Sequence, residues 1–204
     1  KTVQILDKLE IEKPCIDATD EGYNTEWSAE LTVQQAYEEY VKAWFLLHIL
    51  NEIFGLSKKS TFVFNMSVGY DLKGIKSPKI DKFIENLKDA SGNSFFQKWK
   101  NELKNAIQNG KIPKISNTSF TENISSKISN SITLSTMHGC PPEDQEIICK
   151  YLMHEKKLHT FVKLNPTLHG YEYVKNAFLK LGFKNIKLKE ESFTHDMQYD
   201  SAVQ

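Results

Sequence analysis

Residues 131–164 read SITLSTMHGCPPEDQEIICKYLMHEKKLHTFVKL, and this stretch decides the fold. It begins with a short β-branched and apolar run at 131–135 and continues into a helical pattern at 143–155, which is entered through a pair of prolines. A second apolar run closes it at 160–164. Two short strands separated by one helix are typical of a parallel βαβ unit, because parallel strands need a long crossover connection. The stretch therefore predicts an α/β protein.

The same alternation extends in both directions along the chain. Upstream, apolar residues at three- and four-residue steps predict a long helix over 33–54, with Thr32 as its N-cap. The aromatic and β-branched run TFVFNMSV predicts a buried strand over 61–68. The segment 111–130 is rich in Ser, Thr and Asn and is predicted to be a polar loop within the same domain. The remaining predicted elements are helices over 79–90, 95–108 and 171–181 and strands over 1–6 and 184–188.

This order of elements favours a partial TIM-barrel-like (βα) repeat with about five parallel strands. A complete barrel needs eight such units and roughly 250 residues, whereas the chain has 204 residues. An open doubly wound sheet is the competing architecture, but no GxGxxG motif follows any predicted strand. The sequence begins at Lys1 without an initiator Met. We therefore interpret residues 1–204 as one segment of a larger barrel domain.

The amino-acid composition argues against several classes of function. Twenty-six basic and 26 acidic residues cancel, so no net field favours binding to nucleic acid or to a membrane surface. No apolar stretch is long enough for a membrane span, and no signal peptide opens the chain. The three cysteines have no CxxC spacing, which favours a cytoplasmic protein without a structural metal. Every basic residue is Lys, so an anion site must use Lys, backbone N–H groups or a helix N-terminus.

Polar residues near the ends of the predicted strands are the candidates for chemistry, because βα folds bind ligands at that edge. Lys163 stands near the end of an apolar strand, where it either holds an anion or cofactor or reaches solvent from an edge strand. Asn165 follows that strand, and Asn65 belongs to the 61–68 strand. Thr136 and Cys140 follow the 131–135 strand before a helix N-terminus, which would lower a thiol pKa. A structural role for this Cys is the alternative.

Several longer stretches carry a resemblance to a known family. The chain resembles the N-terminal barrel region of the selenate reductase large-subunit family, whose relatives are also called glutamate synthase (NADPH)-like oxidoreductases. The resemblance implies a multidomain flavin and iron–sulfur protein whose barrel is similar to that of dihydroorotate and dihydropyrimidine dehydrogenases. It also implies FAD, NAD(P)H and iron–sulfur cluster sites elsewhere in the parent protein. The stretches that carry it are CIDATDEGYNTEWS, EEYVKAWFLLHIL, FVFNMSVGYDLKGIKSPK, LSTMHGCPPE and LHTFVKLNPTLHGYEYV.

The resemblance also assigns site residues. The family barrel holds FMN with a Lys-Thr pair that matches Lys1 and Thr2, and with a second Lys in a VKLxP strand that matches Lys163. The dehydrogenase base of similar barrels is a Cys or Ser at an NLSCP-type strand end. Here Thr136 stands in that region and Cys140 is displaced along the loop. Both are candidate catalytic residues, and the sequence departs from the pattern of the similar barrels at this point. The resemblance allows FMN in the intact barrel, but no cofactor is expected in this segment alone.

Three functional hypotheses follow. The first is a segment of an oxidoreductase subunit that lines an FMN or substrate site and that is not expected to be active by itself. The second is a flavin-free barrel that serves as a docking or electron-transfer scaffold. The third is an unrelated βα enzyme that uses Lys163 as a Schiff-base lysine. The expected partners are the remaining domains of the parent and other redox subunits, and open strand edges lead us to expect self-association of the segment.

Overall fold

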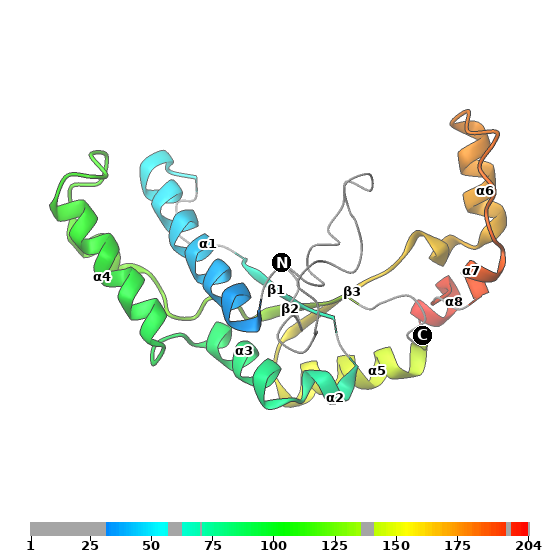
Figure 1. Cartoon of the computed structure of the whole chain (residues 1–204), viewed down its shortest axis with the longest axis horizontal. Helices are drawn as coiled ribbons and strands as arrows, with labels where there is room; N and C mark the ends of the chain where they lie inside the picture. The colour runs from blue at the N-terminus through cyan, green and yellow to red at the C-terminus, as the bar shows by residue number, and fades with distance from the viewer. Residues whose placement is uncertain (1–31, 57–62, 70, 136–140, 195–196, 204) are drawn as a thin grey trace.

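The computed structural model describes residues 32–56, 63–69, 71–135, 141–194 and 197–203. Its centre is a three-stranded parallel sheet in the order β1-β2-β3 (Figure 1). The strands are β1 (Asn65–Val68), β2 (Ser131–Ser135) and β3 (His159–Lys163). Successive right-handed βα units place consecutive strands side by side and parallel, both in a complete barrel and in part of one. The predicted parallel α/β architecture is therefore confirmed, and the sheet is not closed among the described residues.

The expectation of about five strands is not confirmed. The predicted strand over 1–6 lies outside the described residues. The segment 184–188 is described and is not a strand, so that prediction is wrong. It follows α6 (Tyr171–Lys180), which stands away from the sheet in Figure 1, and Ile186 within it is 47% exposed. The alternating apolar residues there reach no strand edge within the described ranges, and a strand without a neighbour has no hydrogen-bonding partner.

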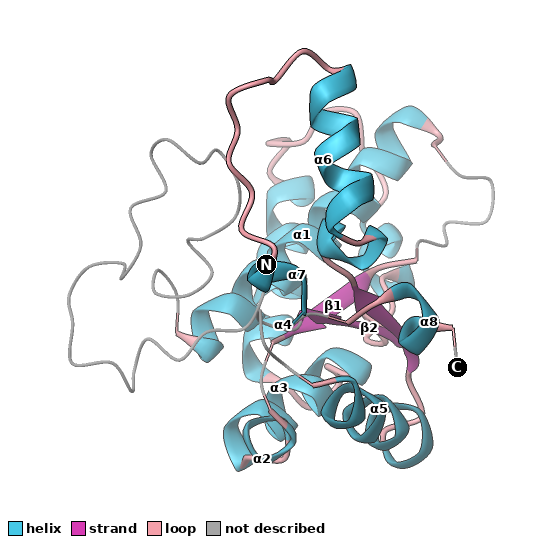
Figure 2. Ribbon diagram, turned by 90° about the vertical axis from the view of Figure 1, so that its right-hand side faces the viewer, coloured by secondary structure: helices cyan, strands magenta, loops and turns pink. Residues whose placement is uncertain are grey.

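Helices connect and cover the strands (Figure 2). The predicted helices agree with the observed ones to within two residues, except that the predicted 143–155 helix is α5 followed by a π-helical turn, η4. In Figures 1 and 2, α2, α3 and α5 lie together on one side of the sheet, as right-handed crossovers require. The connecting elements are α2 (Leu72–Ile75), α3 (Pro78–Lys88), α4 (Ser94–Gln108), η3 (Thr118–Asn123), α5 (Pro142–Lys150) and η4 (Tyr151–Glu155).

The long first helix, α1 (Val33–Phe54), confirms the predicted capping signals. The Thr32 hydroxyl accepts from the Gln35 backbone N–H at 3.2 Å, while the Gln35 side chain accepts from the Thr32 N–H at 2.8 Å. This capping box satisfies two amide donors that have no partner within the helix. Gly55 ends the helix with φ of 61°, a left-handed conformation that Gly adopts without a Cβ clash. The buried side of α1 faces α3 and α4, with the rings of Phe45 and Phe96 5.1 Å apart.

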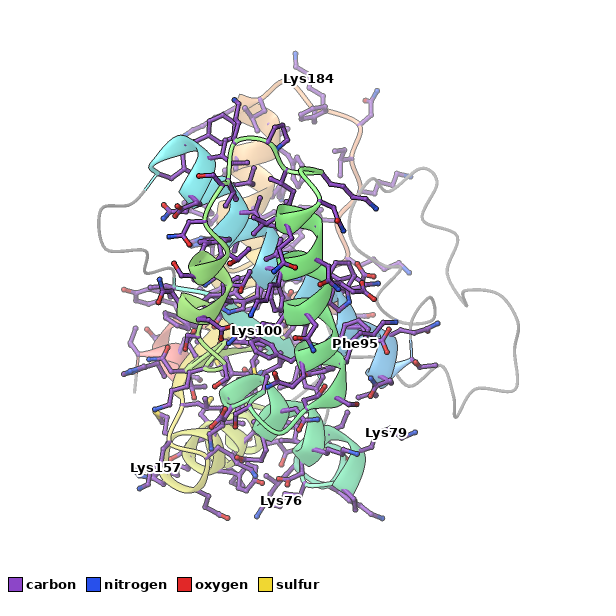
Figure 3. All side chains as sticks on the ribbon, turned by 90° about the vertical axis from the view of Figure 1, so that its left-hand side faces the viewer. Lys76, Lys79, Phe95, Lys100, Lys157 and Lys184 are labelled. Atoms are coloured by element: carbon purple, nitrogen blue, oxygen red, sulfur yellow. The ribbon has the colours of Figure 1, made fainter. Side chains whose placement is uncertain are left out.

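The 111–130 segment is a loop that contains η3, and apolar anchors hold it against the core. Ile115, Ile124 and Ile128 are each less than 5% exposed. The Trp44 indole N–H donates to the Ser125 carbonyl at 2.9 Å, which ties the loop to α1. Thr121 and Ser129 are buried, whereas many of its other polar side chains are exposed. The exposed Glu122 carboxylate forms an ion pair with the Lys100 ammonium, labelled in Figure 3, at 2.8 Å. A sequence rich in Ser and Asn is thus ordered by isolated Ile residues.

The C-terminal part of the chain packs loosely on the rest. The helix α6 has no buried residue. Figure 1 shows it projecting at one end of the molecule, and Lys184 beyond it lies at the periphery in Figure 3. The other C-terminal elements are η5 (Pro166–His169), α7 (Glu191–Thr194) and α8 (Tyr199–Ala202). Within the part of the chain that is described, no helix is long and apolar enough to cross a membrane.

One largely buried lysine holds the crossover that enters β3 against α3. Lys156 follows η4, and its side chain is 13% exposed. Its ammonium forms ion pairs with the carboxylates of Asp81 and Glu85 on α3, the latter at 2.9 Å. Burial raises the pKa of Glu85, but hydrogen bonds and charges from Lys156 and Lys88 outweigh burial and lower it overall. The ion pairs therefore couple α3 to the start of β3 while Glu85 is ionised.

Replacing this lysine tests the coupling. We expect Lys156→Met to lower the free energy of unfolding by about 1–2 kcal/mol at neutral pH, between the values for exposed and buried ion pairs. Because the pKa of Glu85 is lowered by folding, its contribution is present above its ordinary pKa and is lost as pH falls through the folded value. The difference between the two proteins, measured by urea unfolding, should therefore shrink in acid.

The matched control is Lys150→Met. Lys150 pairs with Glu146 on α5, and both side chains are more than 60% exposed. Such a pair contributes little, so the change should stay below about 0.5 kcal/mol. Equal effects of the two substitutions would contradict the assigned role of Lys156.

Candidate functional site

The register of the sheet divides its side chains into two faces. Met66 pairs with Ile132, and Val68 pairs with Leu134; all four are fully buried in the core. We call this side the outer face. Side chains alternate along a strand, so the neighbours of these residues point to the other side, which we call the inner face. The inner-face residues are Asn65, Ser67, Ser131, Thr133, Ser135, His159, Phe161 and Lys163.

The inner face is polar and partly open. Seven of its eight side chains carry a hydroxyl, amide, imidazole or ammonium group. Phe161 in the middle of β3 is 56% exposed, whereas the outer-face residues Ile132 and Leu134 are completely buried. Apolar side chains on one face and polar ones on the other match a sheet whose outer face carries helices and whose inner face surrounds a site.

Lys163 lies on the inner face of β3, which is an edge strand of the described sheet. It is the last residue of β3, and its register partner is Ser135, the last residue of β2. Neighbouring strands are about 4.8 Å apart, so this ammonium-bearing side chain and this hydroxyl start side by side at the carboxyl edge. Lys163 is exposed, and Ser135 is 6% exposed. Asn165 follows two residues later, half-buried, at the N-cap position of η5.

A second polar contact crosses the inner face at the other end of the sheet. The Asn65 side-chain amide donates a short hydrogen bond to the Thr133 hydroxyl, which links β1 to β2. Asn65 is level with Ser131 and His159, four register positions before Lys163 and two strands away. Strand spacing and rise place the two backbones roughly 16 Å apart. The structure therefore does not bring Asn65 and Lys163 together, and a cofactor contact for Asn65 stays a prediction.

The edge of β1 is occupied by a tyrosine from α1. The Ser67 backbone N–H donates to the Tyr40 hydroxyl oxygen at 3.1 Å. The Tyr40 ring packs edge-on against Phe64 and Phe83, with centroids 5.8 and 5.7 Å away. Burial raises the pKa of Tyr40 to about 12, although the Ser67 hydrogen bond partly opposes the rise. This neutral hydroxyl positions β1 against the helix layer.

The other predicted site residues cannot be placed. Lys1, Thr2, Thr136 and Cys140 lie outside the described residues, so their roles stay predictions. Cys149 on α5 is a free, half-buried thiol whose pKa is raised by burial, which makes it a poor nucleophile.

Two inner-face residues were not among the site residues predicted from the sequence. Thr133 accepts the hydrogen bond from Asn65, and Ser135 is the register partner of Lys163. The signal was present in SITLS, where hydroxyl side chains alternate with Ile132 and Leu134. A period of two in a half-buried strand predicts that such residues share one face.

Successive parallel strands with helices on the outer face, and with polar side chains at the carboxyl edge of the inner face, define an α/β domain built from parallel βα units. The chain belongs to the family described as the N-terminal TIM-barrel domain of oxidoreductase YgfK, which matches residues 1–204. The predicted resemblance to the N-terminal barrel of an oxidoreductase is thereby confirmed. The finer assignment to selenate reductase is not confirmed by this match.

Two curated relatives are similar over the whole chain. The protein called "Putative oxidoreductase YgfK" from Escherichia coli strain K12 is 48% identical over 213 residues, as is the protein of that name from E. coli O157:H7. The alignment covers 100% of this chain but 21% of each relative, so the chain spans about a fifth of their length. The chain is thus related to one barrel-forming part of a larger protein. No solved structure matches it.

The Tyr40 contact makes a prediction for the sheet. We expect Tyr40→Phe to lower the free energy of unfolding by about 1–2 kcal/mol, because the Ser67 N–H then loses its acceptor in a half-buried position. Tyr173→Phe is the matched control, since Tyr173 is 62% exposed on α6. Thermal and urea unfolding measure both changes. No loss in the first variant, or an equal loss in both, would show that the hydrogen bond does not support β1.

Proposed function

We propose that the inner face at the carboxyl edge of β2 and β3 forms part of an FMN site in a multidomain oxidoreductase. Membership in an oxidoreductase barrel family gives the class of protein. The observation that carries the proposal is the register, which pairs Lys163 with Ser135 on the inner face at the strand ends. TIM-barrel enzymes bind their ligands at that edge.

The chemistry of these side chains fits one part of a flavin. An ammonium group and a neighbouring hydroxyl offer hydrogen-bond donors to the electron-rich carbonyl edge of the isoalloxazine ring. A positive charge there favours the reduced, more negative ring, so Lys163 would both orient the ring and tune its reduction. Bound FMN would supply the hydride and electron chemistry that protein side chains lack. No Arg is present in the chain, so the phosphate would depend on Lys or backbone N–H groups.

The wider redox assembly is part of the same proposal. Relatives in which this chain spans about a fifth of the length have room for further domains. We place FAD and iron–sulfur clusters in those domains, and we assign the barrel one redox site in the electron-transfer chain. Lys1 and Thr2 would complete the FMN contacts, and Thr136 or Cys140 would stand next to the reacting part of the ring.

This geometry gives less support to two other functions. A Schiff-base lysine depends on desolvation, but Lys163 is exposed among the described residues. A flavin-free scaffold is favoured by Thr136 at the position where related barrels carry their base. That second candidate shares the same fold and differs only in the absence of bound FMN.

Flavin binding by the full-length protein that carries these residues is the test. We expect FMN to be released on denaturation, and Lys163→Met to weaken FMN binding by about tenfold or more, because a charge-assisted contact is lost. Lys163→Arg should retain most of the affinity, and Lys180→Gln at the end of α6 should leave it unchanged. Absorbance and fluorescence titration of the apoprotein measure the affinities.

Two results would count against the proposal. Protein that contains FAD but neither contains nor binds FMN would favour the scaffold function. FMN binding that is indifferent to Lys163→Met would place the flavin elsewhere.

A further inference from the structure

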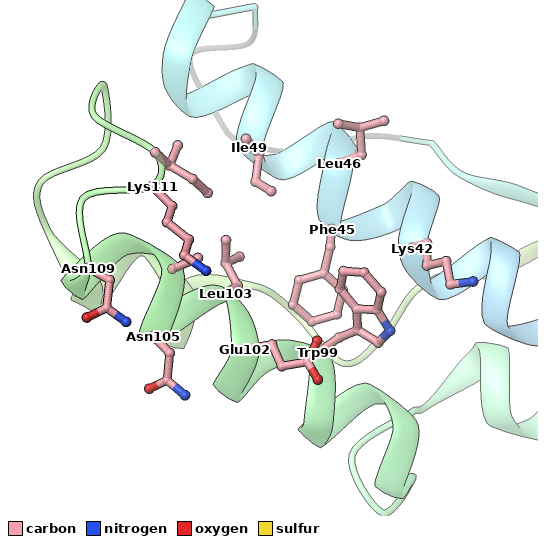
Figure 4. Close-up of a pocket in the computed structure, with 12 residues that line it drawn as sticks. Lys42, Phe45, Leu46, Ile49, Trp99, Glu102, Leu103, Asn105, Asn109 and Lys111 are labelled. Atoms are coloured by element: carbon pink, nitrogen blue, oxygen red, sulfur yellow. The ribbon is translucent and has the colours of Figure 1, made fainter.

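A groove between α1 and α4 lies in the helix layer, apart from the inner face of the sheet. Its volume is about 640 Å³, within the range of small-molecule sites. It runs from Lys42 and Trp99 at one end to Ile49 and Lys111 at the other (Figure 4). Its walls are mostly apolar, formed by Phe45, Ile49, Trp99, Leu103, Ala106 and Ile112.

The charges around the groove are unevenly compensated. Lys42 pairs with Glu39 at 3.1 Å, and Glu102 pairs with Lys98 at 3.8 Å. Lys111 forms no ion pair with any residue in the described ranges. Figure 4 shows its side chain extending towards α4. One end of an apolar groove therefore carries an uncompensated positive charge.

The volume of the groove favours a small molecule as its occupant. On α1 the lining runs from Lys42 to Ile49, a rise of about 10 Å. Beyond this stretch, the charged Lys114 ammonium lies over the exposed Phe54 ring, 5.3 Å from its centroid. The apolar surface therefore does not continue as an open track along α1.

We propose that this groove binds a small amphipathic monocarboxylate, with its apolar body against Phe45 and Leu103 and its carboxylate on Lys111. Apolar burial supplies most of the affinity, and the charge pair selects the head group. This site is separate from the proposed FMN site, because its lining comes from helices and the adjoining loop rather than from the sheet. It gives the domain a binding site for an organic acid on its helical side.

The test uses decanoate below its micellar concentration, with decanol and decylammonium as head-group controls. We expect decanoate to bind the full-length protein that carries these residues measurably by calorimetry, and at least fivefold more tightly than either control. Lys111→Gln should weaken decanoate binding about fivefold and leave decanol binding unchanged. Lys114→Gln, in the same loop but outside the groove lining, should leave both unchanged.

Two further variants locate the ligand. Ala106→Phe should fill the groove and abolish binding while the melting temperature and circular dichroism spectrum stay native. Trp99 lines the groove, so a dansyl-labelled carboxylate should receive energy from it, and Trp99→Phe should reduce that transfer. The proposal is overturned if decylammonium binds as tightly as decanoate, if Ala106→Phe binds normally, or if folded wild-type chain binds none of the three compounds.

Discussion

The two-residue alternation of the three parallel strands is the constraint on which the rest of the structure depends. Met66, Val68, Ile132 and Leu134 meet on one face, where each is fully buried. A slip of one residue in any strand would move its apolar side chains to the open face and bury its polar ones. The crossover helices therefore have one apolar surface to cover, and Lys163 has one face on which to lie. Burial on the outer face thus fixes the chemistry of the inner face.

Much of the fold was predictable because its elements carry local signals. Thr32 and Gln35 form a capping box within four residues, and Gly55 ends α1 for a local steric reason. The segment 184–188 shows the limit of such signals, since its alternation resembles a strand but no sheet edge of the described part of the chain lies beside it. Strand formation depends on a neighbour that a short sequence window does not contain.

The candidate site was predictable only in part, for the same reason. Lys163 could be named from its position in an apolar strand, but its face depends on register with β2, 28 residues earlier in the chain. The contact of Tyr40 with Ser67 joins residues 27 apart, and the ion pair of Lys156 with Glu85 joins residues 71 apart. No local pattern encodes these partners. The alternation in SITLS did contain the inner-face hydroxyls, because it depends on one strand alone.

The barrel family and the described geometry give a consistent account of the domain. The outer face is a conventional apolar layer beneath helices, and its stability depends on contacts that follow from the sequence pattern. The inner face gathers hydroxyl, amide and ammonium groups, which contribute little to packing and whose position at the strand ends suits a ligand. The groove between α1 and α4 adds a second, chemically different surface on the helical side.

Thiol labelling of single-cysteine variants tests the assignment of faces most directly. In a chain whose native cysteines are replaced by Ser, Phe161→Cys and Ile132→Cys would be compared under native conditions. The account predicts that the thiol at 161 reacts nearly as fast as in the unfolded chain, because Phe161 is 56% exposed, and that the thiol at 132 is protected. Protection at 161 with rapid labelling at 132 would contradict the register and the site built on it.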